Sequence, residues 1–179
     1  MCDDLSHVED KGVLVAPPTP HSSPRLVTLF TDASMCPTTL LGAYALWAKA
    51  DGITYRHSGV FRQPLPRPDS TRAEFQAMLN GLTMVATRIK PHWNGMVVAQ
   101  TDSEGVVNML NSPPGPGKLL PRNYTELFEQ FALLRQRLTC RVSFRWVRGH
   151  QGNQNVRSAV NTWCDVEARR VLRQARDAR

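Results

Sequence analysis

The fold is decided by residues 26–61, which read LVTLFTDASMCPTTLLGAYALWAKADGITYRHSGVF. Three apolar and β-branched segments in this stretch predict strands, the first beginning at Leu26 and ending near Asp32, the others over 42–50 and 53–61. The pair Asp51-Gly52 separates the last two segments and is typical of a tight hairpin, because both residue types tolerate positive φ. We therefore expect the ordered chain to open with strands joined by hairpins.

Downstream of this stretch the apolar pattern changes from strand to helix and back. A proline-rich loop, QPLPRPD, leads into a predicted helix that Ser70 or Thr71 can cap. The further segments predict, in order, a strand over 95–101, a short helix over 103–110, a long helix over 124–138, a strand over 140–147 and a final helix from about 158 to 175. This order predicts an α/β fold in which helices flank a five-stranded mixed β-sheet. Trp47 and Trp146 fall in strands and are expected in its core.

Composition divides the chain into two unequal parts. Residues 1–24 are rich in proline and serine, which resist regular structure, so we expect a disordered leader and a single domain over 25–179. The chain carries a formal net charge of +7, and the leader has −3, which leaves +10 on the domain. Such a surplus favours a polyanionic partner, above all nucleic acid.

The four cysteines are scattered, and none forms a CxxC pair. This spacing argues against a disulfide framework or a zinc site and favours a reducing compartment, the cytoplasm. The acidic N-terminus lacks the apolar region of a signal peptide, and GVLVA at 12–16 is too short to span a bilayer. We expect no membrane partner.

Four carboxylates lie at the ends of predicted strands or on predicted helices. Asp32 and Asp102 close the first and fourth predicted strands, Glu74 lies early in a helix, and Asp165 lies on the final helix. Taken singly, each also suits a structural role as a turn, cap or salt-bridge residue. If the two strands lie side by side, however, all four side chains can reach one crevice, where they would repel one another unless cations neutralise them. Oxygen ligands suit Mg²⁺ or Mn²⁺, and two such ions can support phosphodiester hydrolysis.

At these residues the sequence resembles type 1 ribonuclease H, from about Leu26 to Ala175. Five segments that match family motifs follow in the family's order: TDAS (31–34), STRAEFQAMLNGL (70–82), TDSE (101–104), WVRGHQG (146–152) and NTWCDVEAR (161–169). The resemblance implies a ribonuclease H-like fold and an endonuclease that cuts the RNA strand of RNA–DNA hybrids. We expect a monomer, because nothing in the sequence demands more. Contacts to 2′-hydroxyl groups would supply the preference for RNA.

Carried over to this chain, the resemblance implies a role for particular residues. Asp32, Glu74, Asp102 and Asp165 would ligate two Mg²⁺ ions, for which Mn²⁺ could substitute. His150 would assist proton transfer or product release. Contacts with substrate would come from Ser34, Ser70, Thr71, Arg72, Glu104 and Asn161.

The sequence also departs from the family pattern. Ala33 replaces the usual glycine, Glu104 stands where glutamine commonly reads the hybrid's groove, and the loop after His150 looks enlarged. We expect the tryptophan-rich basic handle of bacterial members to be absent, since the corresponding stretch is only NSPPGPGKLLPRN. Grip on the substrate must then come from other basic residues, for which the candidates are Arg62, Arg67, Lys118, Arg122, Arg169, Arg170, Arg173 and Arg176.

Two other functions are compatible with a chain of this kind. One is a nuclease of related fold that acts on DNA, as a resolvase or exonuclease does, but the WVRGH and CD segments belong to the ribonuclease H pattern. The other is a hybrid-binding module without catalysis, which would be expected to have lost a metal ligand. None of the four carboxylates is missing here.

Overall fold

The computed structural model describes residues 24–113, 124–149 and 155–178 of the chain. Five strands form one sheet: β1 (Leu26–Met35), β2 (Gly42–Ala50), β3 (Ile53–Val60), β4 (Met96–Thr101) and β5 (Arg141–Trp146). The helices are α1 (Ser70–Met84), continued by a π-helical turn η1 (Val85–Ile89), α2 (Glu104–Asn111), α3 (Thr125–Arg137) and α4 (Val156–Asp177). The predicted α/β fold with a mixed five-stranded sheet is confirmed.

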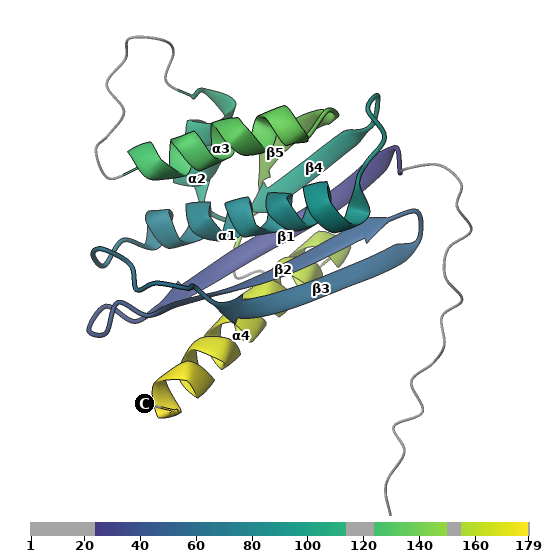
Figure 1. Cartoon of the computed structure of the whole chain (residues 1–179). Coiled ribbons are helices and arrows are strands. Elements are labelled where there is room, and N and C mark those ends of the chain that lie inside the picture. Colours follow the sequence, from purple (N-terminus) through teal and green to yellow (C-terminus); the bar gives the residue numbers. More distant parts are fainter. Residues whose placement is uncertain (1–23, 114–123, 150–154, 179) are drawn as a thin grey trace, which may run out of the picture.

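The strand order in the sheet is β3-β2-β1-β4-β5. β1, β2 and β3 are antiparallel neighbours, whereas β4 and β5 run parallel to β1 (Figure 1). Asp51 and Gly52 connect β2 to β3 with φ values of 47° and 82°, as expected for a tight hairpin between twisted strands. The central strands β1 and β4 therefore end at the same edge of the sheet.

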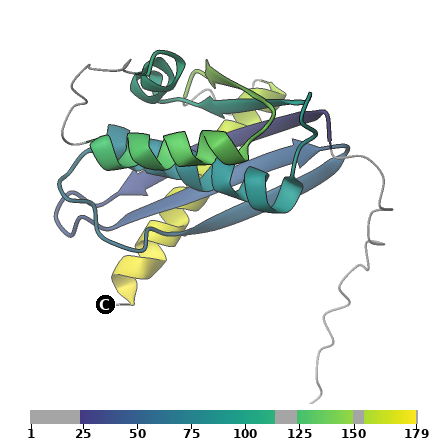
Figure 2. The same cartoon turned by 45° about the horizontal axis from the view of Figure 1, so that its top comes forward.

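Helices cover the sheet on both faces (Figures 1 and 2). α1 and α3 pack on one face, where Phe75, Met78 and Leu82 are completely buried. α4 packs on the other face, where Phe30 contacts Cys164 and Ala168. Consecutive residues of a strand point to opposite faces, so β1 contributes to both layers.

Three local expectations were wrong. β1 does not end near Asp32 but continues to Met35, because its pairing with β2 persists to the end of the strand. The cap of α1 is Asp69, whose Oδ1 accepts a hydrogen bond from the backbone N–H of Arg72 at 3.0 Å. Trp146 is 49% exposed, because β5 is an edge strand.

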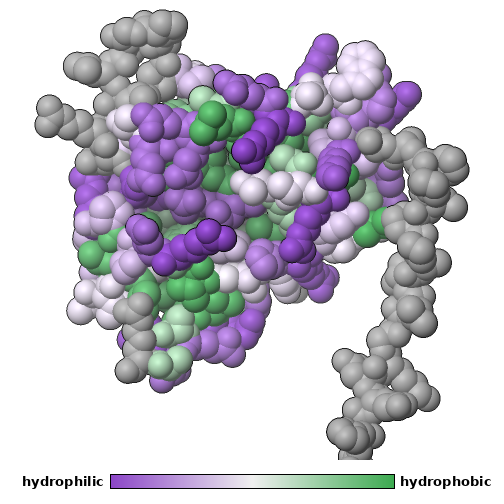
Figure 3. Space-filling view, viewed as in Figure 1, coloured by the Kyte–Doolittle hydropathy of each residue, from purple (hydrophilic) through white to green (hydrophobic). Residues whose placement is uncertain are grey.

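Within the described ranges, no helix combines the length and apolar character needed to cross a bilayer. Hydrophilic side chains cross the middle of the face that carries α1 and α3 (Figure 3).

Candidate active site

Three acidic side chains meet where β4 ends, beside Asp32 of β1. Oxygen atoms of Asp32, Glu74 and Asp102 all lie within 4.8 Å of one another. Asp32 is 4% exposed, and the other two residues are partly buried. These are three of the four carboxylates that the sequence pattern assigned to one crevice.

The register of the sheet brings two of them together. Phe30 of β1 lies beside Gln100 of β4 in the parallel ladder, and continuing this register places Asp32 beside Asp102. Alternation along β1 turns Asp32 to the same face as Phe30. Asp102 follows the last residue of β4 directly, so its side chain stands at the open edge.

Glu74 reaches the same point from α1 and is held by two donors. Its Oε1 accepts a hydrogen bond from the backbone N–H of Ala33 at 3.0 Å, and its Oε2 accepts one from the Thr101 hydroxyl at 3.4 Å. These donors belong to β1 and β4, so the helix carboxylate is tied to both central strands. The Thr101 hydroxyl in turn accepts a hydrogen bond from the backbone N–H of Ser103 at 3.2 Å.

The electrostatics of the cluster are unfavourable to ionised carboxyl groups. Burial first, and then the charges of Asp102 and Asp165, raise the pKa of Asp32 from 3.8 to about 8. Burial and the charges of Asp32 and Asp102 also place the pKa of Glu74 well above its usual value. Carboxylates packed this closely either share protons or bind a cation.

The donor set fits a hard divalent cation. All three groups offer oxygen atoms, and Mg²⁺ and Mn²⁺ prefer carboxylate oxygen over nitrogen or sulfur ligands. Among the described residues, no lysine or arginine forms an ion pair with Asp32, Glu74 or Asp102. A cation would relieve the repulsion that contributes to the raised pKa values of Asp32 and Glu74.

Asp165 lies on α4 and is not part of the three-residue group. Its Oδ1 forms an ion pair with Arg169 Nε at 2.8 Å, one helical turn further along. It nevertheless stands close enough for its charge to raise the pKa of Asp32. The structure thus places Asp165 at the margin of the cluster, with an ion-pair partner of its own.

Asn161 of α4 contacts the cluster directly. Its Nδ2 donates a hydrogen bond to Asp102 Oδ2 at 3.3 Å, and the residue is 2% exposed. Its Oδ1 is buried and has no hydrogen-bond partner within the part of the chain that the structure describes. An acceptor left without a partner beside three carboxylates suits a cation or a water molecule bound to one.

The end of β5 and the residues that follow it also lie against Asp102. Trp146 Nε1 donates a hydrogen bond to the Asp102 carbonyl oxygen at 3.0 Å. A Cβ at Gly149 would lie 2.5 Å from Asp102 Oδ2, so a larger residue here would displace the Asp102 carboxylate. His150 is the next residue in the chain and lies outside the described residues, as do Lys118 and Arg122.

The other residues predicted to contact substrate lie on three elements, β1, α1 and α2. Ser34 lies two residues beyond Asp32 on β1 and is partly buried, while Ser70 and Thr71 begin α1. Arg72 instead forms an ion pair with Glu126 of α3 at 3.2 Å. Glu104 is exposed at the start of α2.

Two residues that support the site were not identified from the sequence. Thr101 holds Glu74, and Asp69 caps α1 while accepting hydrogen bonds from the Tyr124 hydroxyl at 3.1 and 3.0 Å. Thr101 is the first residue of the TDSE motif, so the motif could have indicated it. The contact between Asp69 and Tyr124 joins residues far apart in the sequence, and no local pattern indicates it.

The sequence matches the family model described as RNase H over residues 24–173. No curated protein matches the chain significantly. Among solved structures, the N-terminal RNase H domain of a Mycobacterium tuberculosis protein has a TM-score of 0.63 at 16% identity, with 86% of this chain and 97% of that one covered. LC11-RNase H1 in complex with an RNA/DNA hybrid gives 0.62 at 15% identity, covering 83% and 98%. The prototype foamy virus protease-reverse transcriptase gives 0.60 at 16% identity, covering 86% of this chain and 22% of that one.

Proposed function

The chain belongs to the ribonuclease H family, and we propose that the cluster of Asp32, Glu74 and Asp102 is its active site. The enzyme hydrolyses the RNA strand of RNA–DNA hybrids. The observation that supports this site is the convergence of three carboxylates within 4.8 Å, where β4 ends beside Asp32 of β1. Two of these carboxyl groups have pKa values raised by burial and mutual repulsion, as is common where carboxylates work together.

We propose that the cluster binds two Mg²⁺ ions, for which Mn²⁺ can substitute. Asp32, Glu74 and Asp102 would supply ligands, and Asp165 would complete the set after exchanging Arg169 for metal. Such ions activate a water molecule and stabilise the leaving oxygen of an in-line phosphodiester displacement.

The protein's own groups would position this chemistry. The Ala33 N–H and the Thr101 hydroxyl fix the Glu74 carboxylate, and Asn161 fixes Asp102. His150 would move a proton or help release the cut strand, since an imidazole titrates near neutral pH. Gly149, against Asp102, brings the chain to the active site immediately before this histidine.

Substrate contacts are proposed around the same edge. Ser34, Ser70 and Thr71 would meet the sugar-phosphate backbone of the hybrid, and the exposed Glu104 would lie toward its groove. Asn161 is 2% exposed, so it would act on the substrate through its contact with Asp102. Arg72 would contribute if it left its ion pair with Glu126. Contacts to 2′-hydroxyl groups distinguish RNA from DNA without reading the base sequence.

We further propose that residues 25–179 form the catalytic domain and that a single chain is sufficient for activity. Cys36, Cys140 and Cys164 are free and buried, which supports a reducing compartment such as the cytoplasm.

The test is cleavage of four end-labelled substrates: RNA–DNA hybrid, duplex DNA, duplex RNA and single-stranded RNA. Each is incubated with Mg²⁺, with Mn²⁺ or with EDTA, and the Asp102→Asn variant serves as the blank. We expect cutting only in the RNA of the hybrid, only with metal, and not by the variant.

Other outcomes identify the alternatives. Cutting of duplex DNA would make the enzyme a resolvase or exonuclease of related fold. Tight binding of the hybrid without cutting would make it a recognition module. Full activity of Asp102→Asn would remove the carboxylate cluster from the mechanism.

A further inference from the structure

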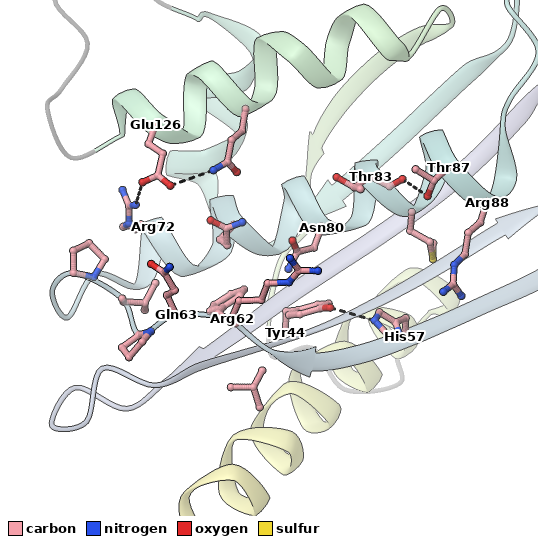
Figure 4. A pocket seen from close by; sticks show the side chains of 18 residues that line it. Tyr44, His57, Arg62, Gln63, Arg72, Asn80, Thr83, Thr87, Arg88 and Glu126 are labelled. Atoms are coloured by element: carbon pink, nitrogen blue, oxygen red, sulfur yellow. Dashed lines mark hydrogen bonds and ion pairs between the residues drawn. The ribbon is translucent and has the colours of Figure 1, made fainter.

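A groove of about 860 Å³ runs along α1 (Figure 4). None of the three clustered carboxylates lines it. One wall is α1, and the other is formed by β3 and the segment that follows it. Tyr44 lies between them, stacks on Phe61 and hydrogen-bonds with His57 at 3.2 Å between Oη and Nε2. The groove is therefore built on packed aromatic side chains.

The helix wall is a polar stripe. Gln76, Asn80, Thr83 and Thr87 follow one another at intervals of three or four residues, which places them on one face of a helix. Glu74 points from a different face of α1 toward Ala33 of β1. The same helix thus presents one carboxylate to the active site and a row of amide and hydroxyl groups to the groove.

Positive charge in the groove is only partly neutralised. Arg62 and Arg88 are exposed, and neither forms an ion pair with an acidic side chain in the described ranges. Figure 4 shows Arg62 directed toward Asn80 and Arg88 directed toward the strand that carries His57. Among the described residues that line the groove, only Glu126 is acidic, and it is already paired with Arg72.

We propose that this groove binds the phosphate backbone of a nucleic-acid strand that extends beyond the active site. The proposal rests on the proposed function, since it concerns a part of the same substrate. Guanidinium groups and side-chain amides are typical donors to phosphate oxygens and position a strand without reading its sequence. A groove without a free carboxylate also avoids repulsion of the strand. Arg62 and Arg88 would provide two phosphate contacts.

The test compares binding of a long hybrid with that of a short hybrid that covers the active site alone. Fluorescence anisotropy is measured over a series of salt concentrations in EDTA, so that metal-dependent cutting does not interfere. For the double variant Arg62→Ala/Arg88→Ala, we expect the salt slope for the long hybrid to fall by about two, or about one per phosphate contact. Its affinity should fall about 10-fold, and the short hybrid should lose much less.

Arg135→Ala/Arg137→Ala is the matched control, because these exposed arginines of α3 carry the same charge and do not line the groove.

The variant Asn80→Asp, which adds a negative charge inside the groove, should weaken long-hybrid binding and leave the fold intact. An equal loss in the control, or an equal loss for both hybrid lengths, would overturn the proposal. If the enzyme failed to cut hybrid but the variants still showed the length-dependent loss, the groove would stand and the proposed function would fall.

Discussion

Two carboxylates of this protein, Asp32 and Glu167, have opposite pKa shifts. Asp32 lies among other acids in the carboxylate cluster, and burial and repulsion raise its pKa to about 8. Glu167 of α4 accepts hydrogen bonds from Arg170 at 2.7 Å and from the Ser58 hydroxyl of β3 at 2.7 Å, which lower its pKa to about 2. The second arrangement stabilises the packing of α4 on β3. The first is destabilising without a cation, which indicates that this cluster is arranged for binding rather than for stability.

The variant Asp32→Asn should most clearly separate the contribution of this carboxyl group to activity from its cost in stability. Removing a metal ligand should lower hybrid cleavage by more than roughly 100-fold, beyond the usual loss from a residue that only supports a ligand. The same change removes a carboxyl group whose ionisation is opposed by burial and by its acidic neighbours, so the metal-free protein should gain at least about 1 kcal/mol, or roughly 2–4 °C in Tm. Cleavage assays and thermal unfolding in EDTA measure the two effects. A variant that lost both activity and stability would contradict this account.

Asn161→Ala should have a smaller effect on activity. Asp102 would lose its side-chain donor, and cleavage should fall about 10- to 100-fold, as for other groups that orient a metal ligand. Raising the Mg²⁺ concentration should restore part of the activity, because the ligands themselves remain. A loss that no Mg²⁺ concentration relieves, together with a lower Tm, would show that Asn161 has only a packing role.

The pH dependence of stability should differ between the two regions. The pKa of Asp32 is higher in the folded, metal-free protein than the usual 3.8, so the contribution of this group to stability is greatest at low pH and falls as pH rises from about 4 to about 8. Mg²⁺ should reverse this fall, because it binds the ionised form. Tm measured across pH, with EDTA or Mg²⁺, tests this, and Asp32→Asn should flatten the EDTA profile. A flat profile in the unaltered protein would contradict it.

Glu167→Gln should have the smallest effect and the opposite sign. The lowered pKa of Glu167 contributes stability above its usual value of 4.5, which is lost as pH falls toward about 2. Because Arg170 is partly exposed, the loss in the variant should be only about 1 kcal/mol at neutral pH. Denaturant unfolding measures it, and hybrid cleavage should be unchanged. A large loss of activity would show that α4 transmits this contact to the active site.

Much of the fold could be predicted from local pattern. The strand over 42–50 and the hairpin at Asp51-Gly52 agree with the structure, because alternation and turn chemistry act over a few residues. The end of β1 was wrong, since strand length depends on how far β2 remains paired with it. Trp146 was wrongly placed in the core, because apolar character does not reveal which strand lies at the edge.

The candidate site was predicted less completely. The motifs identified Asp32, Glu74 and Asp102, and the structure brings these three together. The predicted ligand role of Asp165 stays a prediction, as does the role of His150. The donors that hold the carboxylates, such as Thr101 and the Ala33 N–H, depend on contacts between distant segments.

The sequence by itself determined which segments form strands and helices and which acidic residues stand beside them, because these properties follow from local propensity and periodicity. Only the tertiary structure decided that three carboxylates approach within 4.8 Å and that a polar groove lies behind the helix that carries one of them. The physical reason is that pKa shifts and grooves arise from burial and from distances between segments far apart in the chain. Those distances are fixed when β1 and β4 pair and α1 packs across them.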